Sequence, residues 1–201
     1  MNKTDAVGYV YGLQHTPRWT PNDLGTGHDL VRKFVSGDKS AFDEIYRIYE
    51  EFVYHTCLGV MGNPEDARDA MQETFVSIYN GLRKFRYDSK LSTWVYRTAV
   101  NRCLDALRSR KGRLRDSSVD WFEAPVVMEN QIVQEQMVRS TLMKIKAEYR
   151  AVLVLFYFQG LSYEDIGEIM GWNLNNVRMT LHRARNAFRE KYEDWRCRDE
   201  M

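Results

Sequence analysis

Two short helix signals separated by a tight turn, within residues 160–191, constrain this chain more than any other part of its sequence. Ser162, followed three residues later by Asp165, has the form of a capping box, which satisfies free backbone N–H groups at a helix start. Gly171 predicts the end of that helix because glycine readily adopts the left-handed conformation. Asn173 can cap a second helix. The apolar residues of this second helix recur at helical spacing, and they are Val177, Leu181, Ala184 and Phe188.

The opposite side of the second helix is polar and basic. Its outward residues are predicted to be Asn175, Asn176, Arg178, Met179, His182, Arg185 and Arg189. Two short helices, a turn with glycine and a basic, amide-rich face indicate a helix-turn-helix, whose second helix can enter a major groove. An ordinary helical hairpin with a solvated basic face is the alternative, because the spacing motif is degenerate.

Apolar residues recur at threes and fours along most of the chain, and no segment shows the alternation typical of a strand. The sequence therefore predicts an all-α fold of two small helical domains joined by a flexible linker, the second ending in the helix-turn-helix. We assign a flexible N-terminal extension to 1–27, a first domain to 28–112, an acidic linker to 113–130 and a second domain to 131–195. The expected helices begin near Asp29, Lys39, Pro64, Thr93 and Gln131, and the last of these runs unbroken to Phe158.

Several classes of protein are disfavoured by composition. No apolar run approaches membrane-spanning length, and the first residues lack the pattern of a secretory signal, so we expect a cytoplasmic protein without membrane insertion. The cysteines are isolated and lack metal-ligand spacing, which favours buried or incidental thiols over a disulfide or a zinc site. They are Cys57, Cys103 and Cys197.

Charge is segregated along the chain although the net charge is only +1. Eleven Lys or Arg face two acids between Arg83 and Arg115, whereas eight acids face two arginines between Asp43 and Glu73. Residues 116–138 hold five acids and no basic residue. This segregation indicates partners of opposite sign at different places along the chain.

The helix expected from Pro64 has the clearest start. Asn63 can cap it, proline suits its first position, and Glu65 and Asp66 oppose the positive end of the helix dipole. Its outer face carries Asp69, Gln72, Glu73 and Val76. From the residues alone, a solvated acidic surface is the leading interpretation of this face.

A basic loop rich in aromatic residues follows, with Ser92 as the expected cap of the next helix. Basic side chains neutralise phosphates, and aromatic faces stack on bases that have left a duplex, a contact worth roughly 1–3 kcal/mol per base. The aromatic residues, Asn101 and the excess positive charge together favour contact with single-stranded DNA. Phe85 and Trp94 can instead be core residues, and this alternative stays open for each of them.

Four stretches of the chain resemble bacterial RNA polymerase sigma factors of the small, two-domain, extracytoplasmic-function (ECF) type. Residues 65–75 are similar to the family's polymerase-binding helix, and residues 85–108 to its strand-opening segment. Residues 149–166 resemble the start of its promoter-reading domain, and residues 177–185 its recognition helix. The most specific runs are EDARDAMQETF from Glu65, TWVYRTAVNR from Thr93, GLSYEDI from Gly160 and LHRAR from Leu181.

The resemblance covers roughly residues 28–110 and 135–192, with three departures. Ile145-Lys146 stands where the family usually has a Leu-Pro pair. Asn176 replaces a threonine at the start of the recognition helix, and Thr180 replaces a basic residue. The last two departures bear on the promoter sequence that is read, and none of the three bears on the fold class.

The resemblance implies a non-enzymatic protein without catalytic residues, cofactor or metal. Its partners would be core RNA polymerase, bound through Asp69, Gln72, Glu73 and Val76, and promoter DNA. An anti-sigma factor is a further expected partner, since members of this class commonly have one. The acidic linker, which by composition alone is a simple tether, would pass through the basic cleft of the polymerase.

In promoter DNA, the resemblance places Asn175, Asn176, Arg178, Met179 and His182 in the major groove of the minus-thirty-five element. Amides suit adenine and arginine suits guanine, whereas Arg183, Arg185 and Arg189 would hold phosphates, which sets register without reading sequence. The first domain would open the minus-ten element. Its candidate residues are Arg86, Tyr87, Ser89, Lys90, Trp94, Arg97, Asn101 and Arg108.

Two other classes of protein stay open at this point. A helix-turn-helix regulator could bind duplex DNA without joining polymerase, but the acidic outer helix and the aromatic loop would then have no task. A nucleic-acid-processing enzyme would need a cluster of acids or histidines. The histidines are scattered, at His15, His28, His55 and His182.

Overall fold

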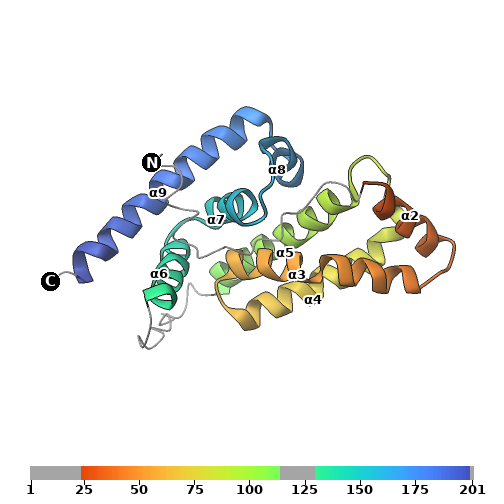
Figure 1. The fold of residues 1–201 in the computed structure, drawn as a ribbon, viewed down its shortest axis with the longest axis horizontal. Helices are drawn as coiled ribbons and strands as arrows, with labels where there is room; N and C mark the ends of the chain where they lie inside the picture. The colour runs from red at the N-terminus through yellow and green to blue at the C-terminus, as the bar shows by residue number, and fades with distance from the viewer. Residues whose placement is uncertain (1–23, 114–129, 200–201) are drawn as a thin grey trace.

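The structure, a computed structural model, describes residues 24–113 and 130–199 (Figure 1). Helices joined by short turns make up these two ranges, and neither contains a strand, which confirms the all-α prediction. Most of the predicted N-terminal extension and acidic linker lies in residues 1–23 and 114–129, outside the described residues.

The first half of the chain is a bundle built around one long central helix. Its helices are α2 (Leu24–Val35), α3 (Ser40–Met61), α4 (Pro64–Gly81), the 3₁₀ turn η2 (Leu82–Lys84) and α5 (Leu91–Arg113). Helix α3 packs against α2, α4 and α5, and its buried stripe includes Ile45, Tyr49 and Val53. The helical spacing of these residues places one apolar face toward the three neighbouring helices.

The second half contains the helix-turn-helix. It consists of α6 (Asn130–Met143), α7 (Ala147–Leu153), the π-helix η4 (Val154–Phe158), α8 (Tyr163–Met170) and α9 (Leu174–Asp199). Helix α9 packs against α6, α7 and α8. The four apolar residues predicted to face inward from α9 are all buried, which confirms the periodicity: Val177, Leu181, Ala184 and Phe188.

The predicted helix ends are confirmed where a capping residue specified them. The Asn63 side chain accepts hydrogen bonds from the backbone N–H groups of Glu65 and Asp66 at 2.8 and 3.2 Å. Ser162 Oγ accepts from the Asp165 N–H at 3.0 Å, and Gly171 ends α8 in the left-handed conformation at φ 68°. Asn173 caps α9 through the N–H of residue 176, at 2.9 Å.

Three predicted boundaries are wrong. Helix α2 begins at Leu24, inside the region assigned to the extension. Helix α5 begins at Leu91, with the Trp94 N–H bonded to the Lys90 carbonyl at 3.2 Å, so Ser92 is a buried residue of the first turn and not the cap. The single helix expected over 131–158 is broken after Met143 and resumes at Ala147, where an extended Lys146 turns the chain.

The two halves are packed on each other in the described structure. Helix α8 packs against α5, while α6, α7 and η4 pack against α3 (Figure 1). One buried hydrogen bond crosses between them: burial raises the pKa of the Tyr96 phenol, so the hydroxyl stays protonated and donates to Gln159 Oε1 at 3.0 Å. The structure therefore shows a closed arrangement of the two domains.

Replacing Asn63 with alanine tests the cap of α4. Because the side chain satisfies two otherwise free N–H groups, we expect a loss of about 1 kcal/mol in the free energy of unfolding. Urea unfolding followed by circular dichroism measures this loss. Asn80→Ala, at an exposed position in the last turn of the same helix, should change stability little; equal losses in both variants would contradict the capping role.

Candidate nucleic-acid and polymerase interfaces

The N-terminal part of α9 presents a polar face to solvent. The cap at Asn173 and the buried side chains of Val177 and Leu181 fix which side of the helix packs on the domain. Six of the seven residues predicted to contact the minus-thirty-five element are exposed there, with Met179 51 % exposed: Asn175, Asn176, Arg178, Met179, His182 and Arg183. The helix thus offers amides, arginines and a methionine to an incoming surface.

Arg185 is the exception on this helix. Its guanidinium is half-buried over the rings of Phe156 and Tyr157, at 5.4 and 5.7 Å from their centroids. It donates to the hydroxyls of Tyr157 at 2.9 Å and Tyr163 at 3.5 Å. Burial alone would lower the pKa of this guanidinium, but the bonds to Tyr163 and Tyr157 outweigh it and raise the pKa. Arg185 therefore ties α9 to η4 and α8 within its own domain.

The outer face of α4 matches the sequence prediction. Asp69, Gln72 and Glu73 are exposed, and Val76 is 61 % exposed, next to the 40 % exposed Tyr79. The inward side of the helix is held by Phe75 and Ile78, and by Ala67 near its start. Protein–protein interfaces combine exposed apolar area with polar and charged side chains around it. The outer face of α4 has both, so it has the character of a protein–protein contact surface.

The loop between η2 and α5 is held by an aromatic cluster. Phe85 packs against Trp94 with ring centroids 5.4 Å apart, and Tyr87 packs edge-on against His28 at 5.3 Å. His28 Nε2 lies 3.1 Å from the Ser89 carbonyl oxygen. Phe85 and Trp94 are half-buried against the core, so each has a packing role alongside any contact with DNA.

Tyr87 occupies a costly backbone conformation in this loop. Its φ of 61° is left-handed, which disfavours a non-glycine residue by roughly 1–2 kcal/mol. The side chain remains 41 % exposed, beside the exposed Arg86, whose Nε lies 3.3 Å from an Asp88 carboxylate oxygen. Such strained conformations persist where neighbouring contacts enforce them, and here the aromatic cluster does so.

His28 is a residue of this site that the sequence reasoning missed. In the sequence it is one of four scattered histidines, and nothing near it shows a ligand or loop motif. The structure brings it from α2 to a loop 61 positions further along the chain. Only its aromatic ring, at the start of an amphipathic helix, could have suggested a packing partner.

On α5 and at the residue just before it, the residues predicted to contact DNA separate into two groups. Asn101 and Arg108 are exposed, and Arg108 pairs with Asp105 at 3.1 Å. Lys90 and Arg97 are instead half-buried against α8: Lys90 Nζ lies 3.4 Å from Asp165 Oδ1, and the Arg97 guanidinium donates to the Glu168 carbonyl. Tyr96, in the segment that resembles the strand-opening region, is buried.

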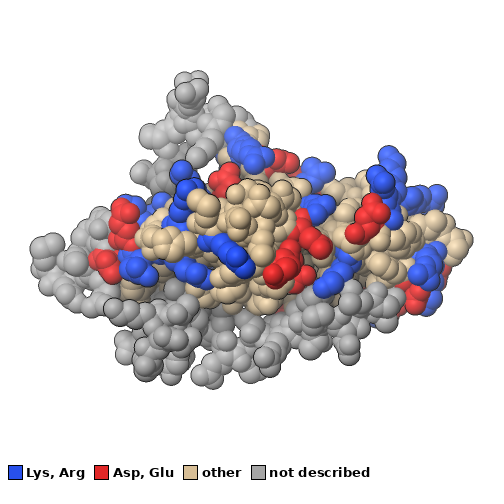
Figure 2. Space-filling model, turned by 90° about the horizontal axis from the view of Figure 1, so that it is seen from above, with Lys and Arg blue, Asp and Glu red and all other residues tan. Residues whose placement is uncertain are grey.

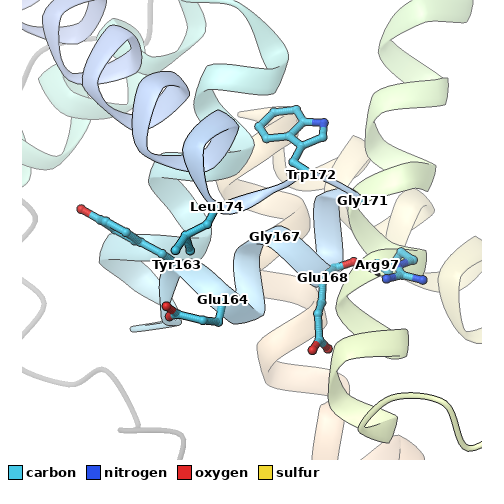
Figure 3. A pocket seen from close by; sticks show the side chains of 8 residues that line it. All are labelled: Arg97, Tyr163, Glu164, Gly167, Glu168, Gly171, Trp172 and Leu174. Carbon is cyan, nitrogen blue, oxygen red and sulfur yellow. Dashed lines mark hydrogen bonds between the residues drawn. The ribbon is translucent and has the colours of Figure 1, made fainter.

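Arg97 lies at the rim of a hollow between α5 and the helix-turn-helix. Figure 3 shows it reaching from α5 to the backbone near Gly171, while the Glu168 carboxylate points away from it. A carbonyl in the last turn of α8 carries partial negative charge, so a cation is favourable there. The arrangement gives Arg97 an intramolecular partner in the closed structure.

Seen from above, this region shows acidic side chains in the middle of the face, between basic groups on either side (Figure 2). The acids of α8 contribute charge of the opposite sign to the basic residues of α5, as the Lys90–Asp165 pair shows. The closed arrangement therefore interrupts the basic surface that the sequence predicted for single-stranded DNA.

Metal and membrane functions find no support in the described part of the chain. Residues 24–113 and 130–199 contain no group of three or more His, Cys, Asp or Glu that could hold a metal ion. None of the helices in those ranges combines the length and apolar character needed to cross a bilayer. Cys57 and Cys103 are buried and free, and a hydrogen bond with Cys57 together with burial raises the pKa of Cys103.

Two family descriptions match the chain. Sigma-70 region 2 matches residues 45–113, which include α4, the aromatic loop and α5. Sigma-70, region 4 matches residues 135–188, which include the helix-turn-helix. The chain is also 31% identical over 179 residues to the ECF RNA polymerase sigma factor SigW of Bacillus subtilis, covering 82% of this chain and 95% of SigW. The chain belongs to the ECF sigma factors of bacterial RNA polymerase.

A second relative agrees: the ECF sigma factor SigM of Mycobacterium tuberculosis is 32% identical over 180 residues, which is 89% of each chain. As a member of the family, the protein is a polymerase-binding sigma factor that directs promoter-specific transcription initiation. The alternative of a helix-turn-helix regulator that does not join polymerase is thereby set aside. The same membership places it among the regulators of transcription.

Solved structures share the fold. The sigma factor RpoE of Bartonella quintana, in a co-crystal structure with the anti-sigma factor NepR, matches with a TM-score of 0.63 and 21% identity, over 76% of this chain and 96% of that one. CnrH, in complex with the cytosolic domain of CnrY, matches with a TM-score of 0.62 and 20% identity, over 84% and 97%. These likenesses support the all-α architecture of the ECF sigma factor.

Replacing His28 tests whether the loop of this sigma factor is positioned from α2. His28→Ala should reduce promoter opening by holoenzyme about fivefold, since losing one hydrogen bond and a ring contact is worth roughly 1 kcal/mol. Permanganate reactivity of the promoter measures opening, and affinity for core polymerase should not change. His28→Gln, which can still donate to the Ser89 carbonyl, should recover part of the loss.

The matched control for this experiment is His55→Ala. His55 lies on the exposed side of α3, 3.8 Å from the Glu51 carboxylate and away from the loop. Normal opening with His28→Ala, or the same defect with His55→Ala, would contradict a positioning role for His28.

Proposed function

We propose that this sigma factor uses three separate surfaces in initiation. The outer face of α9 reads the minus-thirty-five element, the aromatic loop with α5 opens the minus-ten element, and the outer face of α4 binds core polymerase. The observation that carries the proposal is that each of these helices has two distinct faces, one exposed and one buried. Every face assigned to a partner holds exposed polar or charged residues, while the opposite face of the same helix is buried.

At the minus-thirty-five element, we assign base reading to Asn175, Asn176, Arg178, Met179 and His182. Bidentate arginine–guanine or amide–adenine pairs each give about 1–3 kcal/mol of discrimination. Asn176 is exposed while its own N–H is used by the cap at Asn173, so the helix N-terminus is fixed and the amide side chain is left for DNA. Arg183 and Arg189 are exposed and are better placed for phosphate contacts than Arg185, which is engaged by Tyr157 and Tyr163.

At the minus-ten element, the proposed pocket for a base that has left the stack is the loop 86–90 with Asn101. A flipped base needs contacts that replace its lost stacking. The exposed Tyr87, held in a left-handed conformation over the aromatic cluster, can supply a ring, and Arg86 a charge for the backbone. Trp94, half-buried below, would act mainly by supporting the loop.

On the polymerase side, the acidic face of α4 suits a basic partner surface. Asp69, Gln72 and Glu73 supply acceptors, and Val76 supplies exposed apolar area beside them. The helix is anchored by Asp66, which pairs with Arg110 of α5, so the face is presented on a rigid element. A hydrogen bond to Asp66 raises the pKa of Arg110, consistent with a maintained ion pair.

The remaining features of the proposal follow from these partners. The protein would act by binding, without catalysis or cofactor, in the cytoplasm, where core polymerase and promoter DNA are found. By analogy with RpoE, whose structure is a complex with the anti-sigma factor NepR, an anti-sigma factor is a proposed partner.

The base-reading assignment predicts different behaviour for two arginines. Arg178→Ala should lower transcription from promoters with one particular base in the minus-thirty-five element, by roughly 5- to 150-fold for the loss of a contact worth about 1–3 kcal/mol. Arg189 is exposed further along α9, and Arg189→Ala should weaken DNA binding equally at all sequences. It should also lower the salt dependence of DNA binding by the amount expected for about one phosphate contact. Run-off transcription across a library of minus-thirty-five sequences separates the two. An equal loss of transcription from all minus-thirty-five sequences with Arg178→Ala would refute base reading by this residue.

The polymerase surface can be tested by charge reversal. Glu73→Lys should raise the Kd for core polymerase about tenfold, because it places like charges opposite each other. Glu50→Lys, an exposed acid on α3 outside the proposed surface, is the matched control. Fluorescence anisotropy of labelled protein titrated with core polymerase measures both. Equal effects at Glu50 and Glu73 would show that only net charge matters and would remove α4 from the interface.

A further inference from the structure

The contact between the two domains is built on close backbone approach. A Cβ atom at Gly59 of α3 would lie 2.6 Å from Val154 Cγ2, so only glycine allows Val154 to seat there. Val154 belongs to the π-helix η4, is fully buried, and has a short, stiff side chain that cannot move aside. The interface therefore contains a specific site of close packing, Val154 against Gly59, which we call the seat.

The seat continues on both sides of Val154. At the end of the π-helix, Gln159 accepts the buried hydrogen bond from Tyr96. At the other end of the contact, a Cβ atom on Gly62, the C-cap residue that ends α3, would lie 2.2 Å from Met143 Sδ, so a second glycine admits a side chain from α6. Two glycines, one in the last turn of α3 and one at its C-cap, thus accept two side chains of the second domain.

This docking covers part of the proposed strand-opening surface. Asp165 of α8 pairs with Lys90, and the Glu168 carbonyl accepts from Arg97. Each partner is negative or partly negative, as a DNA phosphate is, so α8 occupies two positions where the first domain would hold nucleic acid. The exposed Asn101 and Arg86 lie outside these contacts.

We propose that the docking is an autoinhibitory latch. In the free protein, Val154 seated on Gly59 holds α8 over Lys90 and Arg97, and the chain opens promoter DNA only after the two domains separate. The proposal rests on the assignment of Lys90 and Arg97 to the minus-ten surface. It adds a regulatory role for the second domain, which would both read the minus-thirty-five element and block the first domain until polymerase is engaged.

The latch has a built-in element that favours release. Arg150 of α7 is only 6 % exposed, its Nε has no hydrogen-bond partner among residues 24–113 and 130–199, and its NH1 faces the sulfur of Met143 at 2.7 Å. Burial lowers the pKa of this guanidinium, whose charge acts on Cys103 of α5 across the domain boundary. A buried cation without a carboxylate partner disfavours the closed arrangement and keeps it reversible.

Gly59→Ala tests the latch directly. The new methyl group should unseat Val154 while favouring α3 itself, because alanine forms helix better than glycine. We expect the radius of gyration of the free full-length protein, measured by small-angle X-ray scattering, to rise. The affinity of the free protein for a fluorescent single-stranded oligonucleotide should increase about tenfold if the open form is about a tenth of the population in the parent.

Val154→Ala in the Gly59→Ala background is the rescue variant. It removes the two methyl groups that the new Cβ meets, leaving the Val154 Cβ at 3.5 Å, an ordinary contact. The compact radius and the low affinity for the oligonucleotide should therefore return. Glu50→Ala, an exposed helix-favouring change on α3, controls for stabilisation of the helix alone and should leave both values as in the parent.

Three results would overturn the latch: no rise in radius with Gly59→Ala, a rise without a gain in oligonucleotide affinity, or the same gain with Glu50→Ala. The assignment of Lys90 and Arg97 to the minus-ten surface is tested separately, with the double variant Lys90→Ala, Arg97→Ala in holoenzyme. Normal promoter opening there would refute the minus-ten role of these residues, whatever the radius of Gly59→Ala shows. Loss of the affinity gain when these two changes are added to Gly59→Ala would support both proposals.

Discussion

Helix α3 is packed from two sides, and the arrangement of the whole described structure depends on this. It contacts α2, α4 and α5, and α6, α7 and η4 also pack on it. In its last turns the buried stripe is wide, with Thr56, Cys57, Val60 and Met61 at 0–6 % exposure. A helix that is apolar on more than one face needs partners on each of them. Both domains of the sigma factor therefore share one structural element.

Sharing α3 explains why the closed structure covers two residues that are proposed for the minus-ten surface. Helix α5 packs on α3, and so does the π-helix that precedes α8. Once η4 is seated at Gly59, the short connection through Gly160 leaves α8 against α5, where Lys90 and Arg97 lie. The masking of these two residues thus follows from packing elsewhere.

The sequence predicted the helices best where polar side chains specify an end. Asn63, Ser162, Gly171 and Asn173 act through contacts within four residues, so their effect can be inferred without knowing the tertiary structure. The break after Met143 has no such signal, since no glycine or proline lies between α6 and α7. It arises because Ile145 turns into the core and is buried. The only hint was the family's Leu-Pro pair, which Ile145-Lys146 replaces here.

The candidate sites show the same limit. Helical periodicity correctly placed Asp69, Glu73 and Arg178 on exposed faces, because each helix has one apolar side that must be inward. Periodicity cannot tell which segment lies over a polar residue, and so it missed Arg185 under two tyrosines and His28 under the loop. Both are contacts between residues far apart in the sequence, which only the packing of helices determines.

The closed arrangement must also be weak enough to open. Apolar burial around Val154 and the Tyr96–Gln159 bond stabilise it, whereas the desolvated guanidinium of Arg150, with an unsatisfied Nε, opposes it. A partner can shift such an equilibrium only by the difference in its affinity for the two forms. If the closed form were held by apolar contacts alone, more of the binding energy of polymerase would go into separating the domains. A buried arginine at the boundary reduces that requirement, because its rehydration favours the form that polymerase and DNA can use.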